Sequence, residues 1–331
     1  LSLTSYITTA TIYNNITTYS TYKTESYSQH YEGNVTLKGN ANLIAGANPI
    51  TFSGTVDSDG TPRSLTIGNE TNASTVTFAK DVGGTNSLNN LTFYSDLTLN
   101  DTVTKVNVSS WNNEGAGSVN PGSASTVTVT KDISGSANTF NNLNIAGTGT
   151  SLISGNNKVN GDFTCTQAGK TLSFEAGKTL TVDGSFTITG EAASKITLNS
   201  QTAGSQWILT TPAGDANVTH AIVTDSKSTN PFIRPSYSTN NGNNTNWIFA
   251  ANYRWLSNTT GTDWETAANW QVESSAGVWT TATDFPGNGS DEDTVKVVAN
   301  ANSKYPVYSS ASKGIILDSL EVDADAAASI N

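Results

Sequence analysis

The chain has little of what stabilises or drives many other proteins. Of its 331 residues one is cysteine, none is methionine and only 13% are charged. A lone cysteine excludes an internal disulfide, so hydrogen bonds and packing must hold the fold, and we expect Cys165 to be a small buried apolar residue. The sequence contains no run of about 18 apolar residues, and so it predicts no membrane-spanning segment.

Positive charge is also scarce. The formal net charge is −11 and the sequence pI is about 4.5. Nucleic acids and anionic membranes reward clustered Lys and Arg, so neither is expected as a partner. The chain starts at Leu1 without Met, which indicates that any initiator Met and signal peptide were removed or left out. An acidic, Cys-poor, Thr- and Asn-rich composition is typical of a secreted or cell-surface protein of a bacterium or archaeon.

What the sequence does contain is a series of short apolar–Thr–apolar triplets. Successive side chains of a strand point to opposite faces, so each triplet predicts a short strand with Thr outside. Gly, Asn and Asp lie between the triplets, as tight turns require. The triplets occupy 35–37, 65–67, 76–78, 97–99, 127–129, 180–182, 186–188 and 196–198.

One stretch occurs nearly twice. STVTFAKDVGG at 74–84 is answered by STVTVTKDISG at 125–135, an offset of 51 (125 − 74). Internal repeats of short strands favour a stack of coils, each of which buries its apolar side against its neighbours. We interpret each copy as one coil, or a pair of coils, of such a stack. The competing interpretation is an array of β-sandwiches.

The predicted fold is therefore all-β: a right-handed parallel β-helix, or β-solenoid, with a small Trp-rich β module at the C-terminus. We expect three segments. Residues 1–33 form a Tyr/Thr-rich N-terminal cap or donated strand, 34–250 the β-helical shaft, and 251–331 the Trp-rich β module, which is incomplete if the chain is a fragment of something longer.

The first segment has two interpretations. A cap would cover the edge of the first coil, which otherwise promotes aggregation. A donated strand would instead add to a neighbouring subunit, giving head-to-tail self-association into a filament or array. The apolar and aromatic residues that would carry this assembly are Tyr6, Ile7, Ile12, Tyr13, Ile16 and Tyr19.

Three stretches resemble one class of protein. They are 50–93, with ITFSGTVDSDG and NNLTF; 172–249, with GKTLTVDGSFTITG and NNGNNTNWIF; and the segment from Tyr253, with YRWLSNTTGTDWETAANW. They resemble the filamentous-haemagglutinin-like and autotransporter-passenger-like surface adhesins of bacteria. The resemblance implies right-handed β-helical coils and an exported, cell-surface protein. It names no ligand, because such families share coils without sharing targets.

Catalysis has little support in the sequence. Glycan-cleaving β-helices need paired carboxylates or Asp-bound calcium. The candidate carboxylates fall in turns or polar loops, where a structural role is expected, and no nucleophile elbow or phosphate loop is present. The two histidines are far apart; we expect His220 to lie in a strand over 218–223, on the same face as Val218 and Ile222. No cofactor and no metal are predicted. The candidate carboxylates are Asp57, Asp59, Glu191, Asp215, Asp225 and 291–293.

Four tryptophans of the last segment have two interpretations. They could form an aromatic platform for sugar rings, or the core of a small module. The resemblance favours the core. These residues are Trp255, Trp264, Trp270 and Trp279.

The sequence thus predicts a non-enzymatic extracellular structural or adhesive protein, a surface shaft or filament subunit that acts through repeated contacts. Host or neighbouring-cell glycans or proteins are the other expected partners. The alternative is a glycan-binding or glycan-cleaving β-helix protein of the lyase or hydrolase kind. Outward Thr rows such as Thr126, Thr128 and Thr130 also suit ice binding, although they equally describe the plain exterior of a polar solenoid.

Overall fold

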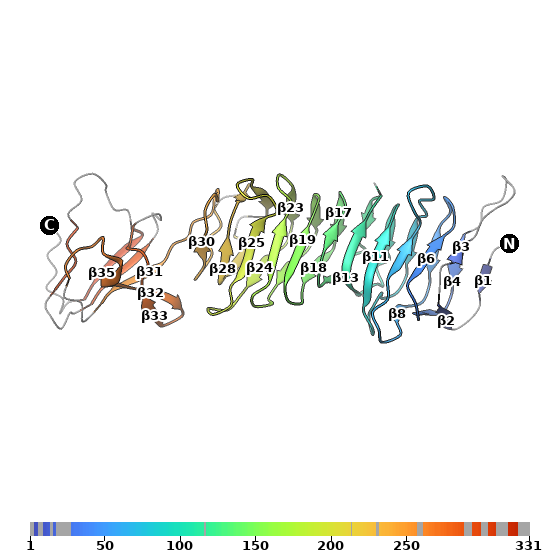
Figure 1. The fold of residues 1–331 in the computed structure, drawn as a ribbon, viewed down its shortest axis with the longest axis horizontal. Helices are drawn as coiled ribbons and strands as arrows, with labels where there is room; N and C mark the ends of the chain where they lie inside the picture. The colour runs from blue at the N-terminus through green and yellow to red at the C-terminus, as the bar shows by residue number, and fades with distance from the viewer. Residues whose placement is uncertain are drawn as a thin grey trace.

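The structure is a computed structural model of an elongated, almost entirely β protein (Figure 1). It describes residues 3–5, 9–13, 16–17, 28–115, 117–212, 214–229, 232–256, 261–287, 293–298, 304–308 and 317–323. A parallel β-solenoid of about 12 turns runs between the N-terminal tip and a small module at the C-terminal end. This confirms the predicted parallel β-solenoid. The right-handed coil stays a prediction.

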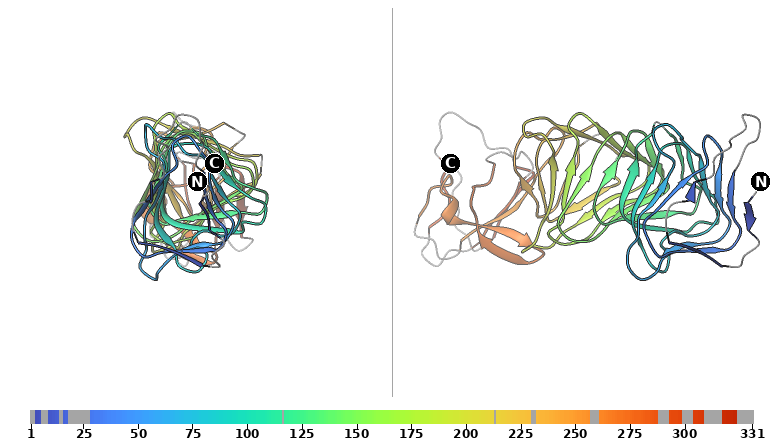
Figure 2. Two further views of the ribbon diagram at one scale, coloured as in Figure 1. Left: turned by 90° about the vertical axis from the view of Figure 1, so that its right-hand side faces the viewer. Right: turned by 45° about the vertical axis from the view of Figure 1, so that its right-hand side comes forward.

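Each coil contributes short strands to three faces, and a view turned toward the N-terminal end superimposes the coils around one cross-section (Figure 2). Face 1 is built from β1 (Leu3–Ser5), β4 (Gln29–Tyr31), β7 (Ile50–Phe52), β10 (Val76–Phe78), β12 (Leu97–Leu99), β14 (Val119–Asn120), β17 (Asn138–Phe140), β20 (Asn157–Val159), β23 (Thr179–Val182), β26 (Trp207–Thr210) and β29 (Ser226–Ser228).

Faces 2 and 3 form one continuous sheet over much of the solenoid, because the long strand β13 (Lys105–Asn113) bends from one into the other. Face 2 holds β2 (Thr9–Ile12), β5 (Asn34–Leu37), β8 (Val56–Ser58), the first half of β13, β15 (Thr126–Val129), β18 (Asn142–Ile145), β21 (Phe163–Cys165), β24 (Phe186–Thr189) and β27 (Ala216–Thr219). Face 3 holds β3 (Ile16–Thr17), β6 (Ala41–Ile44), β9 (Leu65–Ile67), β11 (Leu88–Phe93), the second half of β13, β16 (Ile133–Ser134), β19 (Thr150–Ile153), β22 (Thr171–Phe174), β25 (Ile196–Ser200), β28 (Ala221–Val223) and β30 (Thr239–Asn240).

The apolar–Thr–apolar triplets lie in these strands as predicted. In β10 and β12, for example, both apolar residues are buried and the central Thr is half-buried and outward. Parallel pairing places like residues above one another. The rings of Tyr31, Phe52 and Phe78 therefore stack in a column, with centroids 4.9 and 5.0 Å apart. One core runs the length of the solenoid.

The 51-residue echo is not the structural repeat. Val76, in β10, lies on face 1, whereas Val127, in β15, lies on face 2, two coils and one further face along the axis. Register partners one coil apart are separated by 16 residues at Val127 and Leu143 (143 − 127) but by 30 at Phe186 and Ala216 (216 − 186). Our interpretation of the echo was wrong, because all three faces accept the same apolar–Thr–apolar pattern.

A true coil repeat occurs elsewhere. VNGDFTCT at 159–166 and VDGSFTIT at 182–189 are offset by 23 (186 − 163), and the register pairs Val159 with Val182 and Phe163 with Phe186. The two Phe rings stack with centroids 5.1 Å apart. These two segments therefore occupy equivalent places in successive coils.

The N-terminal tract joins the solenoid in its described parts. β1, β2 and β3 pair in parallel with β4, β5 and β6 of the next coil of the same chain. That next coil includes β4, which precedes the expected boundary at 33, as well as β5, which follows it.

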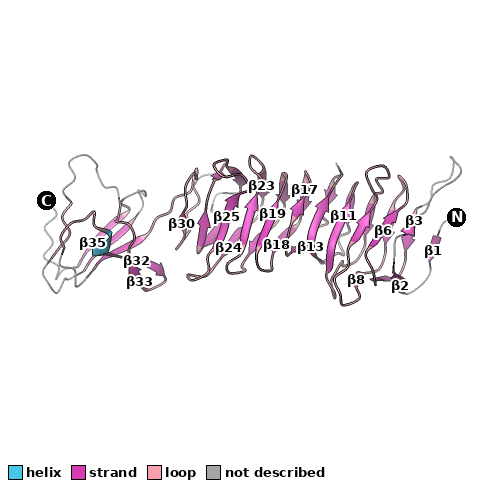
Figure 3. Cartoon of the chain, in the orientation of Figure 1, coloured by secondary structure: helices cyan, strands magenta, loops and turns pink. Residues whose placement is uncertain are grey.

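The C-terminal module is a mixed sheet with its own core. The change of core falls near residue 250: the first core extends to Phe249 and the second begins at Ala251. Strands and the single 3-10 turn in the described part of the chain are distinguished in Figure 3. The strand order is β33 (Val278–Thr281), β32 (Trp270–Ser275), β31 (Asn252–Trp255), β34 (Thr294–Val297), β35 (Ser319–Val322), with η1 (Ala267–Asn269) leading into β32.

Candidate functional site

The residues expected to drive assembly are only partly described. Ile12 is buried in the solenoid core, and Tyr13 beside it is 60% exposed, with the Lys38 ammonium 5.5 Å from its ring centroid. The backbone of Ile16, in β3, pairs with Leu43 of β6, while its side chain lies outside the described part, as do Tyr6, Ile7 and Tyr19. In this chain β2 thus covers its own second coil, which is the arrangement expected of a cap.

Three of the four tryptophans proposed to stack on sugars are inaccessible. Trp255 and Trp270 are 0% exposed and Trp264 is 6% exposed. The rings of Trp255 and Trp264 each pack edge to face on the ring of Trp270, with centroids 4.7 Å apart in both pairs. Their indole N–H groups donate to the carbonyl oxygens of Lys304, Pro286 and Trp264. Trp255, Trp264 and Trp270 therefore form the core of the module, and the sugar platform is wrong for these three.

Trp279 differs from them. It lies half-buried in β33, and the Arg254 guanidinium sits 4.5 Å from its ring centroid. Arg254 is fixed there because its Nε donates to Oε1 of Gln271 at 2.7 Å. One face of this indole is therefore occupied by a cation–π contact.

The candidate carboxylates of the solenoid mostly serve its corners. Asp57 accepts from the backbone N–H groups of Thr85 and Asn86, one coil away. Asp81 likewise accepts from Thr104 and Lys105. Such bonds satisfy backbone donors where the strand ladder stops at a corner. Carboxylates held in this way tie coils together.

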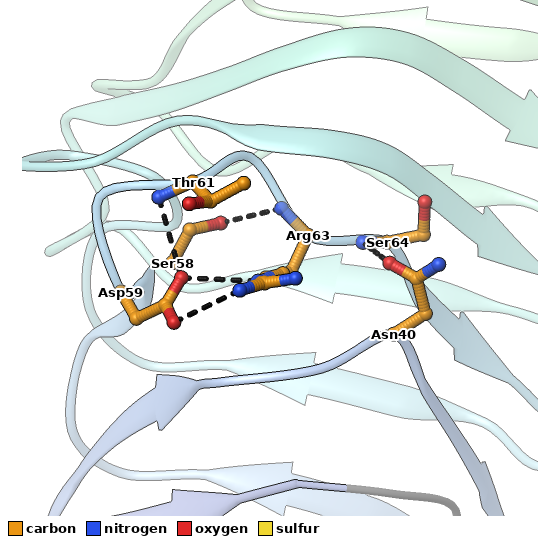
Figure 4. A network of polar contacts seen from close by, with 6 residues as sticks. All are labelled: Asn40, Ser58, Asp59, Thr61, Arg63 and Ser64. Carbon is orange, nitrogen blue, oxygen red and sulfur yellow. Dashed lines mark hydrogen bonds and ion pairs between the residues drawn. The ribbon is translucent and has the colours of Figure 1, made fainter.

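Asp59 has a different partner. Both of its oxygens accept from the Arg63 guanidinium at 3.0 Å, and Oδ1 also accepts from the N–H of Thr61 (Figure 4). These contacts, led by the Arg63 hydrogen bond, hold the pKa of Asp59 below its usual value. In the same loop as Asp59, the N–H of Ser64 donates to Oδ1 of Asn40 in the preceding coil. Asp59 is thus a turn-stabilising carboxylate, as expected.

The two histidines do not come together. His30, on face 1, hydrogen-bonds Oγ of Ser53 at 2.9 Å and lies 3.4 Å from Glu32. His220 occupies a corner with φ of 49°, between β27 and β28, and not the middle of one strand. The corner reverses the alternation, so that Ile222 points outward while Val218 is buried. The predicted strand over 218–223 was therefore wrong.

Cys165 and Lys170 lie together inside the solenoid. Cys165 is fully buried, which confirms the expected small buried apolar residue, and burial raises the pKa of its thiol to about 11. Lys170 is also fully buried, and its Nζ donates to the carbonyl oxygen of Thr130 at 2.9 Å. Burial lowers the pKa of Lys170. Nothing in the sequence marks Lys170 as interior, since lysine is normally exposed.

A cleft of about 760 Å³ lies where the solenoid meets the module. One wall comes from the last coils, with Arg234 and the run from Ser236 to Asn240. The other comes from β32 and β33, with Glu273, Thr280 and Thr281. His220 holds the two parts together, because its Nε2 donates to the carbonyl oxygen of Ser274 at 3.1 Å.

The carboxylates at this cleft are also engaged. Glu273 accepts from Asn252 Nδ2 and from the N–H of Gly277, both at 2.6 Å, and these bonds lower its pKa. Asp293 is buried and accepts from the N–H groups of Ala251 and Gly287 at 2.9 Å. Burial, followed by the nearby Asp293 and Asp284 charges, raises the pKa of Tyr253. Within the described residues no group of three or more His, Cys, Asp or Glu side chains fits a metal ion.

The described residues include no helix long and apolar enough to cross a membrane. No protein-family model, curated protein or solved structure matches the chain. The adhesin resemblance accordingly rests on the three sequence stretches that carry it.

Proposed function

We propose that the chain is an extracellular structural or adhesive protein whose solenoid serves as a stiff surface shaft. The observation that carries this proposal is a single uninterrupted core covered by polar, mostly uncharged outer rows. On face 2 the register stacks Asn107, Thr128, Asn144 and Thr164 in one outward row. Strands in a sheet repeat about every 4.7–4.9 Å, so such a row offers the same contact many times.

The competing proposal is a glycan-cleaving β-solenoid. Its catalytic pair would have to come from carboxylates free to exchange protons with a substrate. Among the described candidates, Asp57, Asp59, Asp225 and Asp293 each accept hydrogen bonds from backbone N–H groups, Arg63 or Asn243. Glu191 and Asp215 are exposed and their carboxylates are not engaged in this way, and Asp291 and Glu292 lie outside the described residues. These engagements favour structural roles, and they support the shaft over the enzyme.

Head-to-tail assembly belongs to the same proposal. A contact between unlike ends does not close on itself and gives open filaments. We test it by electron microscopy of the full chain at rising concentration beside a chain that lacks residues 1–27. This deletion spares β4, whereas a cut at 33 would damage the second coil. Filaments that disappear with the deletion support strand donation; filaments that persist assign the tract to capping.

The shaft itself has a separate test. About twelve coils at 4.7–4.9 Å each predict a rod core roughly 55–60 Å long, which small-angle scattering measures. Release of reducing ends from any polysaccharide by the purified chain, lost in Glu191→Gln or Asp215→Asn, would replace the shaft proposal with the enzyme. We expect no release of reducing ends. We expect beads coated with the protein to attach to cells.

A further inference from the structure

We propose that the cleft between the last coils and the C-terminal module is a binding site for a neutral oligosaccharide. The proposal rests on the adhesive part of the proposed function and names its ligand class. The volume of the cleft, about 760 Å³, lies within the range of about 300–1,000 Å³ typical of small-molecule sites. The cleft is therefore large enough for several linked sugar rings to lie against both walls.

The chemistry of the walls suits a polyhydroxyl ligand. Residues with hydroxyl groups line the cleft on both sides: Ser236 and Thr239 on the solenoid, and Thr280 and Thr281 on the module. A hydroxyl both donates and accepts, so it can pair with sugar hydroxyls in either direction. Ser236, Thr239, Thr280 and Thr281 are exposed, which leaves them open to a ligand.

Charge in the cleft argues for a neutral ligand. Lys195 and Arg234 line one wall. Glu273, Asp284 and Asp293 line the other, and Asp293 is buried and accepts from two backbone N–H groups. Lys195 Nζ already donates to Oγ1 of Thr239 at 2.9 Å, so this cation is partly engaged within the protein. With two cations and three carboxylates around it, the cleft offers little net attraction to a strongly charged ligand of either sign.

Tyr237, an aromatic residue with a left-handed backbone, lines the cleft. Thr219 and Ser236 are bridge partners in successive coils, and the residues after them, His220 and Tyr237, both have φ of 49°. Their rings stack with centroids 5.2 Å apart. For a bulky residue such as Tyr237 the left-handed region is uncommon, and a position of this kind is a candidate for a functional role. Tyr237 lines the cleft, half-buried, where it can meet the C–H face of a sugar.

The experiment uses the full chain on a printed panel of neutral, acidic and amino-sugar oligosaccharides, followed by calorimetry with the best neutral binder. Ser236→Trp fills the cleft from an exposed position and should abolish binding. Ser136→Trp places the same ring at an exposed position on the distant shaft and should change nothing. Binding of a neutral glycan that is lost in Ser236→Trp and kept in Ser136→Trp supports the site.

A second pair of variants separates binding from folding. Tyr237→Gly relieves the left-handed backbone and removes the ring, so it should keep the melting temperature while weakening binding roughly tenfold. Ala137→Gly relieves the same strain, at φ of 64°, far from the cleft and should leave binding intact. No binding at millimolar concentration, or binding that Ser236→Trp leaves unchanged, overturns the site. The shaft proposal then still stands or falls on its own scattering and polysaccharide assays.

Discussion

At the scale of single residues, neighbouring side chains in a strand point to opposite sides, one into the core and the next outward. Val127 is fully buried in β15, and Thr128, the next residue, is half-buried and outward. Val127 packs in the core between its register partners Val106 and Leu143. One position therefore tolerates only an apolar group, and the next accepts many polar ones.

The first prediction compares the same substitution at both positions. Val127→Asp places a charge without a partner in the dry core and should lower the free energy of unfolding by about 3–5 kcal/mol. Thr128→Asp should change it by no more than about 0.5 kcal/mol, as is usual for surface positions. Urea denaturation followed by circular dichroism measures both. Equal effects would contradict the in-and-out alternation of this strand.

Lys170 gives a second prediction, on pH. Burial lowers its pKa in the folded chain below the usual 10.5, although the nearby Cys165 and Asp132 act in the opposite direction. Between the folded and unfolded pKa values the unfolded chain binds more protons, so this lysine makes stability rise with pH up to about 10.5. Below that window both states are protonated and the burial penalty is fully present.

Lys170→Met removes this contribution. The stability of the variant relative to wild type should therefore be greatest at neutral pH and should fall as the pH approaches 10.5. Urea midpoints at a series of pH values measure the difference, in which the titration of other buried groups cancels. Parallel curves for the two proteins would show that Lys170 does not titrate differently on folding.

At the scale of strands and corners, buried amides connect successive coils. Asn138 is fully buried; its Oδ1 accepts from the indole N–H of Trp111 at 3.1 Å and its Nδ2 donates to Oδ1 of Asn157 at 3.0 Å. The amide of Asn157 in turn donates to the carbonyl oxygens of Ser154 and Gly155. These contacts satisfy polar atoms that cannot reach water.

The third prediction breaks this chain of amides. Asn138→Ala leaves the buried Trp111 N–H without an acceptor, which should cost about 1–3 kcal/mol. Trp111→Phe should be less harmful when Asn138 is already Ala than in the wild-type background, because the orphaned donor is then gone. A double-mutant cycle on unfolding free energies measures this coupling. Additive effects would mean that the bond contributes little.

Strands could be predicted at this scale, and corners could not. The triplets at 76–78 and 97–99 are strands because local alternation alone defines their two faces. The turn at His220 was missed, because neither Gly nor Asn marks it and a positive φ is rare for other residues. The inward positions of Asn138 and Lys170 depend on partners one and two coils away, which no local pattern reports.

At the scale of the whole molecule, the repeating unit is the coil. The fourth prediction deletes one coil, 163–185, so that Phe186 follows Asp162 and takes the place of its register partner Phe163. The remaining coils stay in phase, and the shortened chain should fold. Deleting 163–174 removes fewer residues but brings the wrong face into contact, and that chain should not fold.

Circular dichroism and a cooperative melt measure the outcome for both deletions. If the half-coil deletion folds as well as the full-coil one, the phase of the faces does not matter.

The cleft between the solenoid and the module also belongs to the scale of the whole molecule. It forms between Ser236 and Thr281, which are distant in sequence. The sequence could not predict it, because the cleft depends on how the solenoid and the module are arranged. The tryptophans of the module drew attention to a site that is instead a core.

The parallel ladder has a mechanical consequence. Its hydrogen bonds join each coil to the next and lie roughly along the long axis, so a pull on the two ends loads the coils in series. The outermost coil should peel first, while the others remain folded. Each coil of about 20 residues would then release roughly 70 Å of extended chain. Under load the protein would lengthen in steps and absorb work at each one, as a tether does.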